Sequence, residues 1–296
     1  MKRNFNFLLA CLLALPLFAQ NEEATGLPGD QFSLEGALEL FKNAASPEEF
    51  ENLLNKKENE VNNLDVNGDN ETDYVKVISK KDGDAQILIL QVSVSENENQ
   101  DIAVINIEKT GREDAVIQIV GDEDVYGEEM IVEPSDGTEE SLEDNGSGPS
   151  WSSNNAFVVV NVWTWPSVRF IYSPTYRPWV SPWRWRVYPN WWRPWRPLTW
   201  SVWHPLRVKH YRPTVRVVHT HRVVKARTIY KPVRVTSTTV RTRHASAHAN
   251  YKVRKTTTTV KGPRGNAVTK KSTTVKGPKG NVRAQKTTVK KSRRGN

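Results

Sequence analysis

The sequence predicts an α+β fold: a small domain of two N-terminal helices and a four-stranded antiparallel sheet, followed by extended Trp/Pro-rich and disordered basic segments. Three observations lead to this prediction. Apolar residues recur at helical spacing early in the chain, and four β-rich runs with short polar connections follow them. After Leu206 the chain has no further Leu, Phe, Met or Trp, so this part lacks the large apolar surface that an ordinary core needs.

The charges divide the chain into two parts of opposite sign. Residues 20–150 contain all 33 acidic residues and 8 basic ones, which gives a net charge of −25. Residues 151–296 contain 32 basic residues, no acidic residue, all 11 tryptophans and all six histidines, which gives a net charge of +32. The total charge of +9 hides this dipole. We expect the partner of the positive part to be a polyanion, the protein's own acidic part included.

The first 19 residues predict a secretory signal peptide. A basic start is followed by the apolar run Phe7–Phe18 and by Ala19, after which we expect cleavage. The run is too short to span a bilayer, so we expect a mature chain without a transmembrane span, exported to the periplasm, the outer-membrane surface or the extracellular space. Cys11 weakly resembles the cysteine of a lipoprotein signal, and lipidation is the alternative. Cleavage after Ala19 leaves no cysteine, which excludes disulfides and thiol chemistry.

Residues 33–57 predict two short helices. Apolar residues at i, i+3, i+4 and i+7 from Leu34 share one helical face. The second helix begins at a Ser-Pro-Glu-Glu motif, residues 46–49. In this motif Ser caps the helix, Pro occupies a position that needs no N–H, and Glu follows three residues after the cap.

Four runs rich in β-branched and aliphatic residues follow the helices. They are residues 74–80, 86–94, 102–109 and 115–120. The polar connections between them are short, which favours an antiparallel meander with helices packed on one face of the sheet. We expect this acidic domain to span residues 20–133 and to be followed by a linker, residues 134–150, that is acidic at first and then rich in Gly and Ser.

The segment from Asp65 to Asp73 predicts a loop that binds a hard cation. Oxygen-bearing side chains stand at positions 1, 3, 5 and 9, and a main-chain carbonyl is available at position 7, which together suit Ca²⁺. The candidate ligands are Asp65, Asn67, Asp69, Glu71 and Asp73. The loop resembles the calcium loops of EF-hands, dockerins and integrin-type repeats, and this resemblance implies a Ca²⁺ cofactor.

Two departures from that pattern weaken the predicted calcium site. Asn70 replaces the usual Gly at position 6, which is tolerable because Asn enters the left-handed region more readily than most residues. Lys76 stands at position 12, where an EF-hand has a bidentate Glu, so we expect an affinity on the order of 10⁻⁴ to 10⁻³ M. The alternative is a turn in which Asp and Asn side chains bond to their own backbone.

Residues 151–206 form a Trp/Pro/Arg-rich segment, here termed the belt. Its eight prolines argue against a long helix or a central strand and favour extended structure. Indole faces stack on sugars and nucleobases and sit among lipid head groups, and interleaved arginines add charge and cation–π contact. The candidate contact residues are Trp183, Arg184, Trp185, Arg186, Trp191, Trp192, Arg193, Trp195 and Arg196. The alternative is that the rings pack on the acidic domain or on each other.

Residues 207–296 form a basic, low-complexity tail that the sequence predicts to be largely disordered. Nine residues from Thr258 recur fifteen residues later with one substitution, and Gly-Pro interrupts each copy. The density of Lys and Arg suits lipopolysaccharide, acidic glycan or extracellular DNA, in a contact that is sensitive to salt. The alternatives are a solvated linker or an intramolecular clamp on the acidic domain.

The whole pattern resembles a group of secreted proteins of flavobacterial type, and the resemblance implies export and a non-enzymatic role. We expect a secreted or envelope-associated binding and structural protein that contacts anionic surface polymers through the belt and the tail. The acidic domain contains no His and no Cys, so imidazole and thiol catalysis are absent from it. The alternatives are a self-assembling matrix protein or charge-clamped oligomer and, from another class, a carboxylate-dependent glycan hydrolase.

Overall fold

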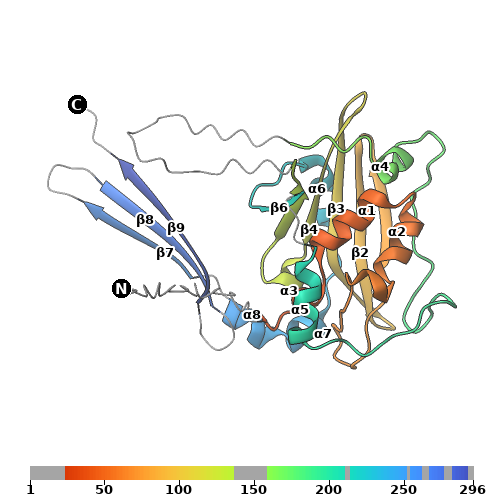
Figure 1. Cartoon of the computed structure of the whole chain (residues 1–296), viewed down its shortest axis with the longest axis horizontal. Helices are drawn as coiled ribbons and strands as arrows, with labels where there is room; N and C mark the ends of the chain where they lie inside the picture. The colour runs from red at the N-terminus through yellow and green to blue at the C-terminus, as the bar shows by residue number, and fades with distance from the viewer. Residues whose placement is uncertain are drawn as a thin grey trace, which may run out of the picture.

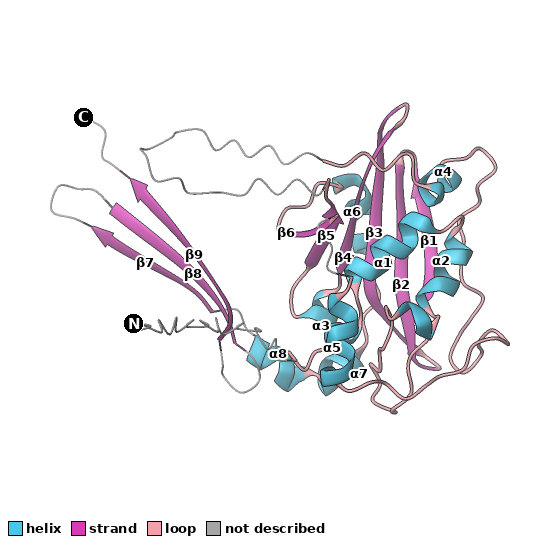
Figure 2. Cartoon of the chain, viewed as in Figure 1, coloured by secondary structure: helices cyan, strands magenta, loops and turns pink. Residues whose placement is uncertain are grey.

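The computed structural model is built around a six-stranded antiparallel sheet whose strands lie in chain order, β1 to β6 (Figure 1). A second antiparallel sheet, β7 to β9, lies apart from the first (Figure 2). The structure describes residues 24–136, 159–210 and 214–251, and the backbone of β7, β8 and β9. The predicted signal peptide, residues 1–19, and most of the predicted linker, residues 134–150, lie outside the described residues.

The first sheet is part of an α+β fold, but it corrects the predicted number of strands from four to six. Its strands are β1 (Lys76–Asp82), β2 (Ala85–Ser95), β3 (Glu98–Gly111), β4 (Asp114–Gly121), β5 (Met130–Pro134) and β6 (Val215–Val218). The four predicted runs form β1 to β4, paired as an antiparallel meander. β6 comes from the basic tail and pairs with β5, for example Val132 with Val217. The count of four is wrong because β5 and β6 are short and β6 meets a partner that is distant in the sequence.

Eight α-helices occur in the described residues, where two were predicted. They are α1 (Leu34–Asn43), α2 (Pro47–Leu54), α3 (Glu123–Tyr126), α4 (Pro166–Ile171), α5 (Trp200–Val208), α6 (Val224–Tyr230), α7 (Thr238–Arg243) and α8 (Ala245–Tyr251), with short 3₁₀ turns at Pro28–Gln31, Lys57–Asn59 and Lys231–Val233. α1 and α2 are the predicted pair. Ser46 caps α2 as expected, because its Oγ accepts a hydrogen bond from Glu49 N at 3.1 Å. None of the described helices is both long and apolar enough to cross a membrane.

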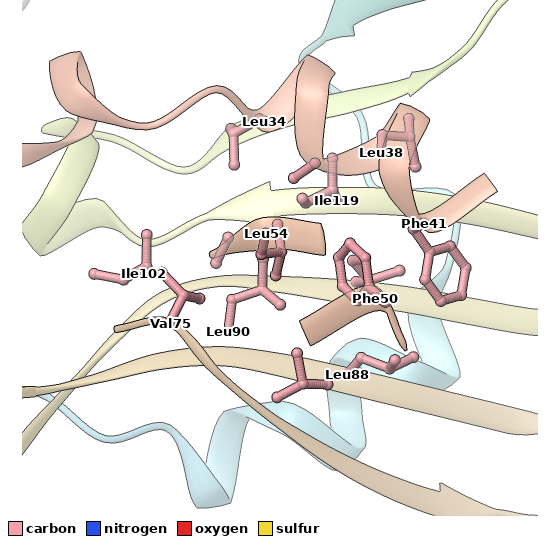
Figure 3. Packing of buried hydrophobic residues seen from close by; sticks show 14 of the residues in the cluster. Leu34, Leu38, Phe41, Phe50, Leu54, Val75, Leu88, Leu90, Ile102 and Ile119 are labelled. Atoms are coloured by element: carbon pink, nitrogen blue, oxygen red, sulfur yellow. The ribbon is translucent and has the colours of Figure 1, made fainter. Parts of the chain in front are cut away.

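The main core lies between one face of the first sheet and the helices α1, α2 and α4. Figure 3 shows apolar side chains of α1 and α2 pointing toward those of the strands. The fully buried residues of this layer include Leu34, Leu38, Phe41, Phe50, Leu54, Val75, Leu90, Ile102 and Ile119. The rings of Phe41 and Phe50 meet edge to face, with centroids 5.3 Å apart. Burial of each large side chain stabilises the fold by about 1.5–3 kcal/mol, so this layer is the principal source of stability.

The opposite face of the sheet is covered by α6, which corrects the expectation of helices on one face only. Val223, Ala226 and Tyr230 are buried there against sheet residues that include Ile87 and Ile89. The described residues of the tail are therefore folded against the acidic domain as far as Tyr251. We term residues 207–251 the basic segment. It needs no core of its own, because the sheet supplies the large apolar residues and the segment adds small and β-branched ones that cover them.

The remaining tail also departs from the predicted disorder. Its backbone forms a three-stranded antiparallel sheet, β7 (Arg254–Lys261), β8 (Ala267–Lys276) and β9 (Val282–Ser292). The repeated Thr-Thr-Val stretches lie on these strands, in agreement with the β preference of Thr and Val. The repeats are thus periodic in structure as well as in sequence.

Candidate functional site

A short stretch of the belt pairs with the free edge of β1. Ser79 N donates a hydrogen bond to Trp179 O at 2.7 Å, and Ser181 N donates one to Val77 O at 3.0 Å. These two bonds continue the antiparallel ladder by one short segment, so the belt covers part of an edge that would otherwise present free backbone groups. They also fix the position of the residues that follow.

Glu51 of α2 holds the belt in place by accepting hydrogen bonds from it. Its Oε2 accepts hydrogen bonds from Val77 N at 2.8 Å and from Trp179 Nε1 at 3.1 Å. Its Oε1 accepts from Ser181 Oγ at 2.9 Å and from Tyr74 Oη at 3.1 Å. Burial raises the pKa of the Glu51 carboxyl, and these donors act in the opposite direction. Because both oxygens are held by donors, Glu51 ties helix, sheet and belt together.

An aromatic cluster forms where the belt leaves β1. The ring centroid of Tyr188 lies 6.0 Å from that of Tyr74 and 4.6 Å from that of Trp192, and the centroid of Trp192 lies 6.0 Å from that of Trp195. Trp192 is only 2% exposed. For Trp192 the structure realises the self-packing alternative, since its ring is enclosed by neighbouring aromatic rings.

Next to this cluster the belt makes a tight hairpin. Arg184 N donates to Val187 O at 3.2 Å, and Val187 N donates to Arg184 O at 2.9 Å. The tip is Trp185-Arg186, with the Arg186 guanidinium 5.4 Å from the Trp185 ring centroid. Arg186 has φ +56°, a left-handed conformation that is uncommon for a side chain other than Gly, Asn or Asp. The tip of the hairpin thus carries an indole and a guanidinium group, and the backbone at Arg186 is strained.

The nine predicted contact residues of the belt have different exposures. The exposed ones are Arg184, Arg186, Trp191, Arg193 and Arg196. The half-buried ones are Trp183, Trp185 and Trp195, and Trp192 is buried. None of the four arginines forms an ion pair with an acidic side chain within the described part of the chain. The belt therefore carries four exposed guanidinium groups next to partly exposed indoles.

A small pocket opens between the start of β1, the strand β2 and the belt hairpin. It is lined by Tyr74, Lys76, Ser93, Trp183, Arg184 and Tyr188. Its cavity volume is only about 10 Å³, roughly the room that one water molecule needs. No acidic side chain lines this pocket, whereas two cationic ones do.

Lys76 is the buried cation of this pocket. It is 8% exposed, and its Nζ donates to Asn99 Oδ1 at 2.8 Å. Burial lowers the pKa of the Lys76 ammonium, while the carboxylates of Glu51 and Asp101 oppose that shift. The ammonium group has three donors and makes this one hydrogen bond within the described residues, so the remaining N–H groups are available to a ligand.

The predicted calcium loop is folded by hydrogen bonds from side chains to backbone. Asp65 Oδ1 accepts from Gly68 N at 2.6 Å and from Asp69 N at 3.1 Å, and Asp65 Oδ2 accepts from Asn70 N at 3.0 Å. Asp69 Oδ1 accepts from Glu71 N at 2.9 Å. Asn70 has φ +66°, as its place in the loop requires. These bonds are those of the alternative interpretation, an Asx-rich turn.

Asp73 closes the loop, and its electrostatics bear on the predicted Ca²⁺. Its Oδ2 accepts from Val66 N at 2.7 Å, and Asn67 Nδ2 donates to Asp69 Oδ2 at 2.9 Å. Burial raises the pKa of Asp73 well above its usual range, and the charges of Asp65 and Asp69 raise it further. A cation would relieve that repulsion. In the described residues, however, no three His, Cys, Asp or Glu side chains gather closely enough to hold a metal ion, so the predicted ligands would have to move inward.

The loop is also a junction between the belt and α7. Thr72 donates to Trp195 O from both its N, at 2.8 Å, and its Oγ1, at 2.9 Å. The Arg243 guanidinium lies against Gly68, where an added Cβ would come within 2.1 Å of its Nη1. A protein cation therefore already borders the acidic loop.

Arginines of the basic segment pair with the acidic domain. Arg234 binds Asp122 through Nε at 2.5 Å and Nη2 at 2.9 Å, and Nη2 also lies 3.2 Å from Asp124 Oδ2. The side chain of Asp122 is 1% exposed. Further pairs join Arg216 and Arg222 to Glu133, Arg227 and His221 to Glu129, and Lys209 to Glu60. The structure therefore realises the intramolecular clamp, the alternative considered for this part of the tail.

Trp183 and Arg184 of the pocket are among the contact residues predicted from the sequence, but the buried members of the pocket are not. Lys76 is interpreted only as a departure from the calcium pattern. Lys76 and Ile78 are two residues apart and so share one side of β1, and an apolar residue on that side indicates that the side is covered. An inward lysine in such a strand is a signal that could have been used.

Comparison with protein-family models, curated proteins and solved structures finds no match to this chain. The geometry of the belt, the pocket and the loop is therefore the basis on which a function can be inferred.

Proposed function

We propose that this protein is a non-enzymatic, secreted or envelope-associated binding protein that contacts anionic surface polymers through the belt. The observation that carries the proposal is a set of exposed arginines with no acidic partner among the described residues, beside half-buried indoles. Glu51 and the β1 edge hold this part of the belt in place. Guanidinium groups bind carboxylates and phosphates through paired N–H donors, and indole faces add stacking. The strands β7 to β9, rich in Lys and Arg, add a contact that is sensitive to salt.

The basic segment has a different role in this proposal. Four of its arginines, Arg216, Arg222, Arg227 and Arg234, form ion pairs with Glu133, Glu129 and Asp122 of the acidic domain. Opposite charges that pair within one chain leave fewer groups to pair between chains. For this reason we favour polymer binding over the charge-clamped oligomer, which would require the same groups.

The test is retention of the purified protein on lipopolysaccharide, polygalacturonate, double-stranded DNA and neutral dextran across a salt series. The belt variant Arg186→Ala/Arg193→Ala/Arg196→Ala removes three exposed cations. The matched control, Lys225→Ala/Lys231→Ala/Arg241→Ala, removes three exposed cations of the basic segment. We expect retention on an anionic polymer, released by salt, that the belt variant weakens at least roughly tenfold and the control far less. Equal losses in both variants, or no retention at low salt, would contradict the proposal.

The proposal includes weak Ca²⁺ binding by the loop from Asp65 to Asp73. Ca²⁺ at 10 times its dissociation constant would stabilise the protein by about 1.4 kcal/mol. We therefore expect about 10 mM CaCl₂, for an affinity on the order of 10⁻³ M, to raise the melting temperature by a few degrees. Asp69→Asn should abolish that rise, and MgCl₂ serves as the control. An equal rise in the variant or with MgCl₂ would leave the loop as an Asx-rich turn.

A further inference from the structure

The belt alternates strictly between half-buried and exposed residues where it passes β1. In residues 179–186 every odd-numbered residue is half-buried and every even-numbered residue is exposed. A period of two is that of an extended chain, whose side chains point alternately to opposite sides. Trp179 and Ser181 donate side-chain hydrogen bonds to the buried Glu51, so the half-buried set faces the protein and the exposed set faces away from it.

The exposed set continues across the hairpin. Val187 pairs with Arg184, and residues paired across two antiparallel segments share one side. Figure 1 shows this part of the chain, in the trace between α4 and α5, at the outer side of the sheet beyond α2. We term the exposed set the outer row, and it consists of Val180, Pro182, Arg184, Arg186 and Val187.

The outer row combines apolar and cationic side chains. Val180 is 60% exposed and Val187 is 41% exposed, and Trp191, further along the belt, is 50% exposed. A single exposed valine needs no explanation. Here, however, the valines lie in one row with two arginines that form no ion pair in the described part of the chain. A soluble polyanion would contact the arginines and leave the valines in water, whereas a surface with both charged and apolar layers would contact both.

The tip of the hairpin carries two large side chains where the backbone favours glycine. Arg186 has φ +56°, and its guanidinium lies 5.4 Å from the ring centroid of Trp185. Strain of this kind is concentrated at functional sites, so the side chains at the tip have a role that a glycine turn would not fill. An indole beside a cation suits the boundary between lipid head groups and acyl chains, where tryptophan is enriched and anionic lipids attract arginine.

We infer that the outer row binds the surface of a bilayer that carries anionic lipid. The valines and the hairpin tip enter the head-group region, and Arg184 and Arg186 bind lipid phosphates. The contact is peripheral and lies in the plane of the head groups. The inference rests on the proposed function, because it uses the same exposed arginines, and it places their anionic partner on a membrane. Lipopolysaccharide has this arrangement, since its phosphates lie at the surface of an apolar layer.

The first test is sedimentation of the full chain with vesicles. We expect at least roughly tenfold tighter binding to mixed phosphatidylglycerol and phosphatidylcholine vesicles than to vesicles of phosphatidylcholine alone. Val180→Ser/Val187→Ser should weaken binding to the mixed vesicles at least roughly fivefold, because it removes apolar surface that the bilayer would cover. The control, Val217→Ser/Val224→Ser, removes two exposed valines of the basic segment and should weaken that binding less than about twofold. Melting temperatures verify that both variants fold.

A fluorescent label measures which side of the molecule meets the lipid. Cys11 is the only cysteine of the chain, so Val187→Cys and the control Val224→Cys, each combined with Cys11→Ser, accept one polarity-sensitive label. On mixed vesicles we expect the label at position 187 to gain intensity and shift to shorter wavelength, and the label at position 224 to keep its spectrum. Soluble polygalacturonate should leave both spectra unchanged, which separates contact with lipid from binding of a polyanion.

The inference fails if the two valine pairs have equal effects, or if the label at position 187 keeps its spectrum on mixed vesicles. Retention on polygalacturonate or DNA without binding to mixed vesicles would also overturn it, but would leave the proposed function intact and make a soluble polyanion the partner of the belt. Absence of binding to the vesicles and to all of the anionic polymers would overturn both.

Discussion

The belt and the basic segment are both rich in arginine and both lie against the same six-stranded sheet, but their arginines are used differently. Arg234 of the basic segment binds a carboxylate that is 1% exposed, whereas Arg186 and Arg196 of the belt face solvent without an acidic partner in the described residues. The difference lies in what is opposite each segment. The basic segment lies over carboxylates of β5 and of the turn at α3. The belt lies against the ring of Tyr74 and the edge of β1. The density of positive charge in a sequence therefore does not distinguish a clamp from a binding surface.

The largest expected effect tests the clamp. Arg234→Ala leaves the buried carboxylate of Asp122 without its cation, and we expect the free energy of unfolding to fall by about 3–5 kcal/mol. Urea denaturation followed by circular dichroism measures it. Arg196→Ala, an exposed belt arginine, is the matched control and should change stability by less than about 0.5 kcal/mol. Equal losses of stability in the two variants would contradict the conclusion that the two segments use their arginines differently.

The next effect tests how the belt is held. Glu51→Ala removes the acceptor of four hydrogen bonds, two of them from the belt, and we expect a loss of about 3 kcal/mol with selective release of the belt. Limited trypsin digestion should then cleave first after Arg184 or Arg186, neither of which is followed by Pro. Glu48→Ala, an exposed residue of the same helix, is the control. Unchanged digestion of Glu51→Ala would mean that the belt is held by its aromatic contacts alone.

A third effect concerns Asp101, a buried acid that forms no ion pair with an arginine in the described part of the chain. Asp101 accepts hydrogen bonds from Gln91 Nε2, Tyr230 Oη and Val235 N, and burial raises its pKa from 3.8 to about 6. The folded state therefore binds more protons than the unfolded state between these values, so stability falls as pH rises through this window. We expect this group to cost about 2 kcal/mol between pH 4.5 and 7.5.

The measurement is the urea midpoint of the wild type and of Asp101→Asn at both pH values. Other groups titrate in both proteins, so the difference between their pH dependences isolates Asp101. The wild type should lose more stability than the variant on going from pH 4.5 to 7.5. Parallel losses would show that Asp101 is ionised in the folded state at both pH values.

The smallest effect tests the strain at the hairpin tip. Arg186→Gly relieves the cost of a left-handed conformation, and we expect a gain of up to about 1 kcal/mol in stability. Retention on an anionic polymer should fall at the same time, since the variant loses a cation. Arg186→Lys keeps the charge and the strain and is the control. A loss of stability in Arg186→Gly would mean that the contact with Trp185 outweighs the backbone strain.

The sequence predicts the parts of the fold that depend on neighbouring residues. The period of α1, the Ser46 cap of α2 and the alternation of β1 to β4 are local signals, and each of these elements is present. The second layer is not local. Val217 in β6 pairs with Val132, and Tyr230 reaches Asp101, across distances in sequence that no periodicity spans.

The residues of the candidate site likewise fall into two groups, those that local sequence signals predict and those that depend on contacts distant in the sequence. Trp183 and Arg184 are visible in the sequence because of their unusual composition, and the loop from Asp65 to Asp73 because of its spacing. Lys76 becomes meaningful only when the belt folds back over β1, since its neighbours in the pocket come from other elements. Which tryptophan is exposed and which is enclosed, as Trp192 is, depends on that same contact.

The order of the two layers along the chain has a consequence for how the protein is made. Ile87, Ile89 and Val104 form a sheet face whose cover, Ala226 and Tyr230, is synthesised more than a hundred residues later. Contacts of this separation slow folding, and a chain emerging from its amino end exposes that apolar face until the cover follows. A nascent or truncated chain ending before α6 should accordingly be prone to aggregation and should be a substrate for chaperones, whereas the complete chain is not.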